Sequence, residues 1–163
     1  MAYDIYDASI PPLIHMLGGL GTILAKGDAH GGIDPADARL APDMLPLKAQ
    51  VYIATDTAKG CGARLAGVEI PKFEDTENTF AELGARVAKT IAFLKTLDRK
   101  AFAGSENKEI VLKFPNTTFE FNGTDYVGKF VLPNAYFHIT TAYAILRNKG
   151  VALGKGDYLG GQK

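Results

Sequence analysis

Apolar residues recur at helical spacing in four separate stretches of this 163-residue chain. The stretches cover about residues 10–27, 43–67, 75–94 and 124–150, and their apolar positions follow an i, i+3 or i+4, i+7 rhythm. That rhythm places the apolar side chains on one face of an α-helix, and such a face must be buried against another element. The pattern therefore predicts an all-α fold in which four amphipathic helices share one core.

Capping residues predict where these helices begin. Pro11 and Pro12 fall in the expected first turn of the first helix, where the missing proline N–H costs little. Asp43 is the expected N-cap of the second helix, and Asp75 or Thr76 that of the third.

The connections between the helices differ in kind. Residues 28–42 are rich in Gly, Pro, Asp and Ala and are numerous enough to cross one end of a bundle. Between about residues 108 and 122 the apolar period changes from 3.6 to 2, which predicts a short β-hairpin that should lean its apolar face on the helices. Residues 151–163 form an aperiodic tail. We predict one domain over residues 1–163, an up-down bundle of four helices with a long crossing loop after the first helix and a β-hairpin before the last.

Charge and cysteine content narrow the class of protein. Eighteen basic residues balance eighteen acidic ones, so no overall positive field exists to attract nucleic acid or anionic lipid. Within the third helix, Glu82 and Arg86 form an expected exposed i,i+4 pair. The uncharged run 8–25 is long enough to cross a membrane, but its prolines, glycines and one-sided apolar spacing favour a core helix. Cys61 is the single cysteine, as is typical of the reducing cytoplasm, where we expect this protein.

The most unusual polar residues lie on the fourth helical stretch. Asn134 and His138 share one face with apolar residues, and Gln50 lies on an otherwise small and apolar face of the second helix. If the two faces meet, Gln50 lies near Asn134 or His138. Pro133 precedes this pair and frees a carbonyl one turn back, which must find another hydrogen bond.

Two interpretations of this cluster remain open at the level of sequence. The first is a closed hydrogen-bonded network in the core. The second is a small-molecule pocket between the second and fourth helices, with Gln50, Asn134, His138 and Tyr143 as its ligand-binding residues. In that pocket His138 is the best candidate for a catalytic general base near pH 7. Whether the protein is an enzyme is left undecided.

A protein interface is the alternative function. Tyr136, Thr140, Tyr143 and Arg147 form a neighbouring stripe on the same helix, and such amphipathic tyrosines suit a homodimer interface.

Several strings, spread over nearly the whole chain, resemble a known family. They are LAPDMLPLKAQ, RLAG, IPKFEDTENTFAELGARVAKT and LPNAYFHITTAYAILRNKGVALGKGDYLG, and they are similar to domain-of-unknown-function family nineteen ninety-three, within the DinB and YfiT-like four-helix-bundle superfamily. The resemblance implies the bundle fold and a homodimer. It also implies, for some relatives, a divalent metal held by three histidines or thiol-dependent S-transferase activity.

The metal ligands of those relatives are only partly matched. In them one histidine comes from the second helix and two from a His-x-x-x-His pair on the fourth. Here His138 matches one position, Ala142 stands where its partner would be, and the second helix has no histidine. We therefore predict no cofactor and no metal ligands, and keep a divalent-metal enzyme as a third alternative.

Overall fold

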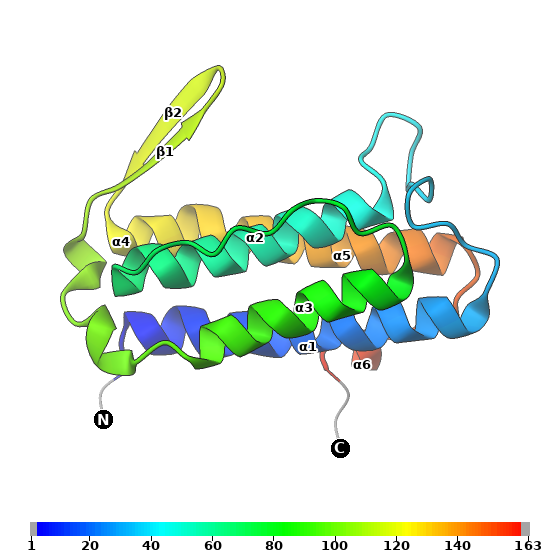
Figure 1. The fold of residues 1–163 in the computed structure, drawn as a ribbon, viewed down its shortest axis with the longest axis horizontal. Helices are drawn as coiled ribbons and strands as arrows, with labels where there is room; N and C mark the ends of the chain where they lie inside the picture. The colour runs from blue at the N-terminus through cyan, green and yellow to red at the C-terminus, as the bar shows by residue number, and fades with distance from the viewer. Residues whose placement is uncertain (1–2, 161–163) are drawn as a thin grey trace.

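Four long helices lie side by side along a common direction (Figure 1). The structure, a computed structural model, describes residues 3–160. The long helices are α1 (Ile5–His30), α2 (Leu47–Ala66), α3 (Phe80–Lys95) and α5 (Leu132–Asn148). The shorter elements are η1 (Arg99–Phe102), η2 (Ser105–Asn107), β1 (Ile110–Phe114), β2 (Thr117–Phe121), α4 (Gly123–Asp125), η3 (Tyr126–Val131) and α6 (Lys155–Tyr158). The predicted all-α bundle with a small hairpin before the last long helix is confirmed.

The helices do not simply alternate in direction. Lys48 Nζ at the start of α2 donates to Asn78 Oδ1 just before α3, at 2.8 Å. At the other end, a Cβ built on Gly62 of α2 would lie 2.8 Å from a methyl carbon of Leu94. Helices α2 and α3 are therefore parallel, and residues 67–79 return along the bundle as a long crossover (Figure 1). Helices α1 and α5 run the opposite way, so the chain passes up, down, down and up.

One apolar core lies between the four helices. Its largest fully buried side chains are those of Tyr126, Ile10, Leu13, Leu17, Leu20, Ile23, Leu24, Leu47, Leu65, Leu83, Leu94 and Ile139. Each buried leucine or isoleucine side chain stabilises the fold by about 1.5–3 kcal/mol. Burial on this scale explains how a chain with so many helical glycines forms a stable bundle.

Helix α1 begins earlier than its prolines suggest. Asp4 is the N-cap and forms a capping box with Asp7, so the first turn starts at Ile5 rather than near residue 10. Pro11 and Pro12 consequently lie inside the helix. An interior proline costs about 3 kcal/mol relative to alanine, a cost that the packing of α1 must offset.

The predicted caps of the next two helices are also corrected. Pro46, not Asp43, precedes α2, and it offers no side-chain cap. Thr79, not Asp75 or Thr76, caps α3, because Thr79 and Glu82 exchange the reciprocal hydrogen bonds of a capping box.

The chain before α5 contains a π-helical turn. In η3 the N–H of Leu132 bonds the carbonyl oxygen of Val127, five residues back instead of four. Pro133 follows directly and has no N–H to donate. The wider turn therefore accommodates the proline. It lies on the N-terminal side of Asn134 and His138.

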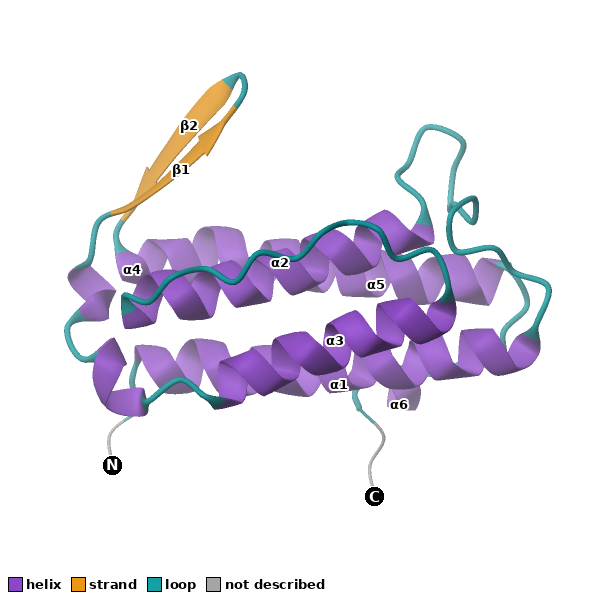
Figure 2. Ribbon diagram, viewed as in Figure 1, coloured by secondary structure: helices purple, strands orange, loops and turns teal. Residues whose placement is uncertain are grey.

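The hairpin stands out from the bundle (Figure 2). Its strands pair in antiparallel register, with Leu112 opposite Phe119. Phe119 and Phe121 lie 6.3 and 5.9 Å from the ring of Phe130 in η3, so aromatic contacts anchor the base of the hairpin. The hairpin leans its apolar face on the bundle as expected, since Ile110 and Leu112 are buried and the ring of Phe114 lies 6.4 Å from that of Phe130, although Phe114 itself is half exposed.

Helix α1 is the one described helix with the length and composition of a membrane span, with a mean hydropathy of 1.4 over its most apolar window. Half of that window, 50%, is buried inside the bundle. α1 also packs along both α3 and α5. These contacts are those of a core helix of the bundle.

Candidate functional site

The predicted polar faces of α2 and α5 do meet. His138 Nδ1 lies 2.7 Å from Gln50 Oε1, and Asn134 Nδ2 donates to Thr57 Oγ1 at 2.7 Å. Gln50, Thr57 and His138 are buried and Asn134 is partly buried. These side chains bond one another across the α2–α5 contact, so a ligand would meet the cluster from its solvent edge.

Hydrogen bonds determine the tautomer of His138. Gln50 Nε2 donates to the carbonyl oxygen of Leu45 at 2.9 Å, which turns the amide oxygen of Gln50 toward the imidazole. An amide oxygen only accepts, so Nδ1 of His138 must carry the hydrogen. In the neutral ring, Nε2 is then left with a free lone pair.

Two acceptor atoms of this cluster have no partner in the described part of the chain. Neither His138 Nε2 nor Asn134 Oδ1 takes part in a hydrogen bond there. Within residues 3–160, no side-chain nitrogen or oxygen is both fully buried and unpaired, so both atoms reach solvent. Because residues four apart share a helix face, the two acceptors lie one turn apart on the same side of α5.

Burial keeps the imidazole neutral. His138 is 9% exposed, and desolvation of the charged form lowers the pKa of His138 below its usual value of 6.5. The ring of Phe137 meets the imidazole edge-on at 5.1 Å and is 56% exposed, which places an apolar surface beside the acceptor. The cluster therefore offers neutral acceptors next to an aromatic ring.

The fourth predicted residue lies apart from the other three. The ring of Tyr143 packs edge-on against Tyr158 of α6 at 6.2 Å, and Thr140 donates to the Tyr158 hydroxyl at 3.0 Å. Tyr143 is thus not part of the Gln50–His138 cluster. The tyrosine stripe proposed as a dimer interface is partly covered by this chain's own C-terminal segment.

The donor atoms of the cluster do not fit a tightly held divalent metal. Protein metal sites usually converge about three ligands, and the cluster offers one imidazole and one neutral amide. Over residues 3–160 no group of three or more His, Cys, Asp or Glu side chains is arranged to hold a metal ion. We therefore derive no metal chemistry for it.

The thiol of Cys61 is not poised for reaction. The side chain is fully buried in the core, and this burial raises the pKa of the thiol to about 12. A thiol with such a pKa stays protonated at neutral pH, whereas the thiolate is the nucleophilic form. Cys61 is a core residue.

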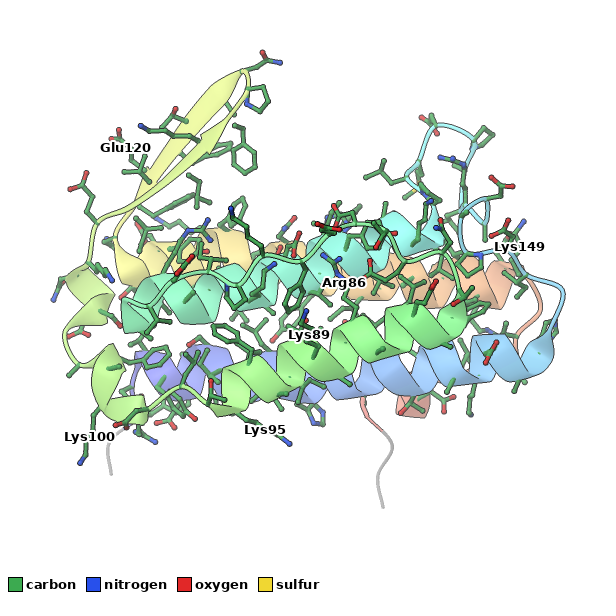
Figure 3. All side chains as sticks on the ribbon, viewed as in Figure 1. Arg86, Lys89, Lys95, Lys100, Glu120 and Lys149 are labelled. Carbon is green, nitrogen blue, oxygen red and sulfur yellow. The ribbon has the colours of Figure 1, made fainter. Side chains whose placement is uncertain are left out.

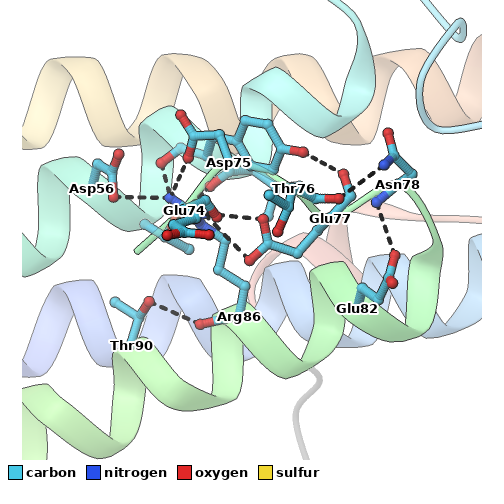
Figure 4. Close-up of polar contacts among 12 residues, drawn as sticks. Asp56, Glu74, Asp75, Thr76, Glu77, Asn78, Glu82, Arg86 and Thr90 are labelled. Carbon is cyan, nitrogen blue, oxygen red and sulfur yellow. Dashed lines mark hydrogen bonds and ion pairs between the residues drawn. The ribbon is translucent and has the colours of Figure 1, made fainter. Parts of the chain in front are cut away.

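A second polar cluster centres on Arg86, which the sequence pattern wrongly assigned to an exposed pair with Glu82. Its guanidinium is fully buried and reaches Asp56 at 3.0 Å, Asp75 at 2.9 Å and Glu77 at 3.1 Å. Figure 3 shows Arg86 turned inward beneath the crossover, whereas Lys95 points away from the bundle. The close-up in Figure 4 shows the carboxylates of the crossover gathered around it.

The architecture defines a class of protein, the DinB-like four-helix bundles. A crystal structure of a DinB family member from Shewanella denitrificans matches this chain with a TM-score of 0.85 and 38% sequence identity. The match covers 96% of this chain and 92% of the other. No curated protein matches the chain.

A family can be assigned as well. Residues 5–159 match the family described as domain of unknown function DUF1993. The chain belongs to this family, and its resemblance at the level of sequence is confirmed.

Proposed function

We propose that this DUF1993 protein binds a small molecule at the solvent edge of the α2–α5 contact, through His138 and Asn134. The observation that carries the proposal is the unpaired Nε2 of His138, whose lone pair is left free by the bond from Nδ1 to Gln50. Gln50 acts as a positioning residue, because its own bond to Leu45 orients the amide. Such sites between facing helices are usual in bundles.

The two acceptors select the chemistry of the ligand. A neutral imidazole nitrogen and an amide oxygen both accept hydrogen bonds, so they favour a ligand that presents N–H or O–H groups. A carboxylate or phosphate has only acceptor oxygens, so its lone pairs would repel those of the imidazole nitrogen and the amide oxygen. The exposed ring of Phe137 adds an apolar contact. The preferred ligand is thus neutral or cationic, with a hydrogen-bond donor joined to an apolar group.

Benzamide and benzoate test this selectivity, because they have nearly the same shape and only benzamide donates hydrogen bonds. We expect benzamide to shift the ¹⁵N resonance of His138 Nε2 saturably, with a dissociation constant on the order of 1 mM for so small a ligand. Benzoate should produce no comparable shift at neutral pH. Equal effects of the two compounds, or none from benzamide, would overturn the proposal.

Two histidine variants separate specific from general effects. His138→Gln should abolish the benzamide shifts around residue 138. His30→Gln is the matched control, because His30 is exposed and its ring approaches Gly150, about three helical turns along α5 from His138. It should bind benzamide as the original protein does.

A homodimer is the second proposed function, and exposed aromatic side chains favour it. Phe114 and Phe119 of the hairpin are 47% and 43% exposed and lie 6.4 and 6.3 Å from Phe130. Phe137 lies two turns after Phe130 on the same side of the helix. Together these residues form an aromatic row, of the kind that is enriched at protein interfaces.

Sedimentation velocity at micromolar concentration tests the dimer. We expect a dimer for the original chain and a monomer for Phe119→Ser, because the hairpin ring lies in the proposed interface. Leu40→Ser is the control, since Leu40 is a similarly exposed apolar residue in the loop before α2. A monomeric original protein would contradict the dimer.

The free Cys61 thiol further supports the reducing cytoplasm as the compartment.

A further inference from the structure

A hollow lies near the N-terminal end of α5, between the start of α1 and the π-helical turn of η3. Its volume is about 530 Å³, within the usual range of roughly 300–1,000 Å³ for small-molecule sites. The lining residues that matter below are Asp4, Ile5, Glu106, Val127, Gly128 and Leu132. None of these residues belongs to the His138 cluster.

The π-helical turn opens one wall of this cavity. Gly128 lies in η3 and contributes no side chain, and a Cβ built there would meet no atom within 4 Å. Its backbone φ is not positive, so the local conformation does not require glycine. Glycine in a helix costs about 1 kcal/mol relative to alanine. At this position the glycine leaves the space beside Val127 and Leu132 open.

The charged residues that line the cavity are acidic. Asp4 is paired with Arg99 at 2.9 Å, and Arg99 also binds Asp7. Arg99 and Lys100 line a neighbouring hollow that shares Asp4 and Glu106. Glu106 is exposed and forms no ion pair within residues 3–160, so its carboxylate is the one charged group of the cavity lining that has no direct ionic partner there.

We propose that this cavity binds a small molecule with an apolar body and a cationic amino group. The body packs against Ile5, Val127 and Leu132, and the ammonium group lies at the carboxylate of Glu106. Apolar walls account for binding of the body, whereas the single unpaired carboxylate selects the charge. The site is separate from the one proposed at His138, so either can fail without the other.

Octylamine and octanoate test the proposal, because they share a chain length and differ in the sign of their charge at neutral pH. In ¹H–¹⁵N spectra of the whole protein, we expect octylamine to shift the amide signals of Val127 and Gly128 saturably at millimolar concentration. Octanoate should bind at least fivefold more weakly, since one unit-charge contact near 4 Å in water corresponds to about that factor. Equal binding of the two probes, or unsaturable shifts, would overturn the proposal.

Two variants locate the binding. Gly128→Leu should fill the cavity and abolish the octylamine shifts, whereas Gly84→Leu, at a helical glycine of α3 that also has open space, should leave them unchanged. Glu106→Gln should weaken octylamine about fivefold and leave octanoate no weaker. Undiminished octylamine binding to a folded Gly128→Leu protein would contradict the assigned cavity, and undiminished binding to Glu106→Gln would contradict the assigned ammonium site.

Discussion

Arg86 joins three segments of the chain through one buried guanidinium. Nε donates to Thr55 on α2 at 2.8 Å, and another nitrogen donates to the Glu74 carbonyl oxygen in the crossover at 3.1 Å. The guanidinium also lies over the rings of Tyr52 and Phe73, at 4.8 and 5.5 Å. A planar group with five donors satisfies this set, which a lysine ammonium could not. Arg86 therefore holds the crossover against both α2 and α3.

Replacing Arg86 by methionine should destabilise the protein by about 3 kcal/mol, the lower end for breaking a buried ion pair, because its carboxylate partners are partly exposed. Urea unfolding followed by circular dichroism measures the change. Lys95→Met, at an exposed position of the same helix, is the control and should change the stability by less than about 0.5 kcal/mol. Similar values for the two variants would contradict the role assigned to Arg86.

The lowered pKa of His138 predicts a pH dependence of stability. In the unfolded chain the imidazole titrates near its usual value of 6.5, whereas in the folded protein burial lowers the pKa. As the pH falls through 6.5 the unfolded chain therefore takes up a proton first, and the free energy of unfolding decreases. His138→Gln should show a flatter decrease between pH 7.5 and 5 in urea titrations. An unchanged slope would contradict this account.

Other groups with shifted pKa values contribute in a different range. Hydrogen bonds lower the pKa values of Asp4, Glu82 and Asp157 below usual values of 3.8, 4.5 and 3.8. Their stabilising effect is present above those values and is lost as the pH falls below them. The contribution of His138 can therefore be measured separately.

Sequence reasoning found the pair Gln50 and His138 but missed the environment of Arg86. The pair was predictable because both residues interrupt otherwise apolar helix faces, which must pack together. Arg86 stands beside Glu82 at an ordinary i,i+4 spacing, so the local pattern indicated a surface pair. Its actual partners, Asp56 and Asp75, are 30 and 11 positions away and become neighbours only through the crossover.

At the scale of elements, a helical glycine determines where the C-terminal segment packs. A Cβ built on Gly19 of α1 would lie 2.6 Å from the backbone oxygen of Tyr158, which cannot move aside as a side chain can. Lys26 pairs with Asp157 at 2.7 Å beside this contact. The close neighbour that explains Gly19 is therefore α6.

Gly19→Ala should displace α6 while leaving the bundle folded. We expect hydrogen exchange at residues 155–159 to increase at least tenfold, with little change in the exchange of α1. Gly18→Ala is the matched control, because a Cβ at Gly18 meets nothing within 4 Å. The control should stabilise α1 by up to about 1 kcal/mol. Unaltered exchange at α6 in Gly19→Ala would contradict the close contact.

Helix ends were less predictable than helix faces. The capping boxes of Asp4 with Asp7 and Thr79 with Glu82 are visible as short spacings in the sequence. They compete, however, with other candidate signals, such as Pro11 for the first helix. Which signal marks the start of the helix depends on tertiary packing, because packing offsets the cost of the prolines inside α1.

At the scale of the whole molecule, the direction of the second connection could not be read from the sequence. Helix α3 has 16 residues, or about 24 Å at 1.5 Å per residue, and the loop of residues 67–79 can reach either of its ends. The parallel path is favoured by contacts between distant residues. Tyr52 donates to the Glu77 backbone oxygen, and Asp75 pairs with Arg86.

These contacts hold the crossover of residues 67–79 against the bundle, and they predict the pattern of limited proteolysis. A protease needs a locally unfolded strand, and a two-stranded hairpin that projects from the body is marginally stable. In protein dilute enough for the proposed dimer to dissociate, chymotrypsin should therefore cut after Phe119, which is half exposed in the single chain, faster than after Phe73, whose ring lies against Lys59 and Arg86. Mass spectrometry of the early fragments gives both rates.

The same digestion of Arg86→Met separates the crossover from the hairpin. Loss of the guanidinium frees residues 67–79 from α2 and α3, so cutting after Phe73 should accelerate at least tenfold, because the rate follows the population of the open form. Cutting after Phe119 should keep its rate, since the base of the hairpin rests on Phe121 and Phe130. If both rates rose together, the variant would have loosened the whole bundle, and the crossover would not be a locally held segment.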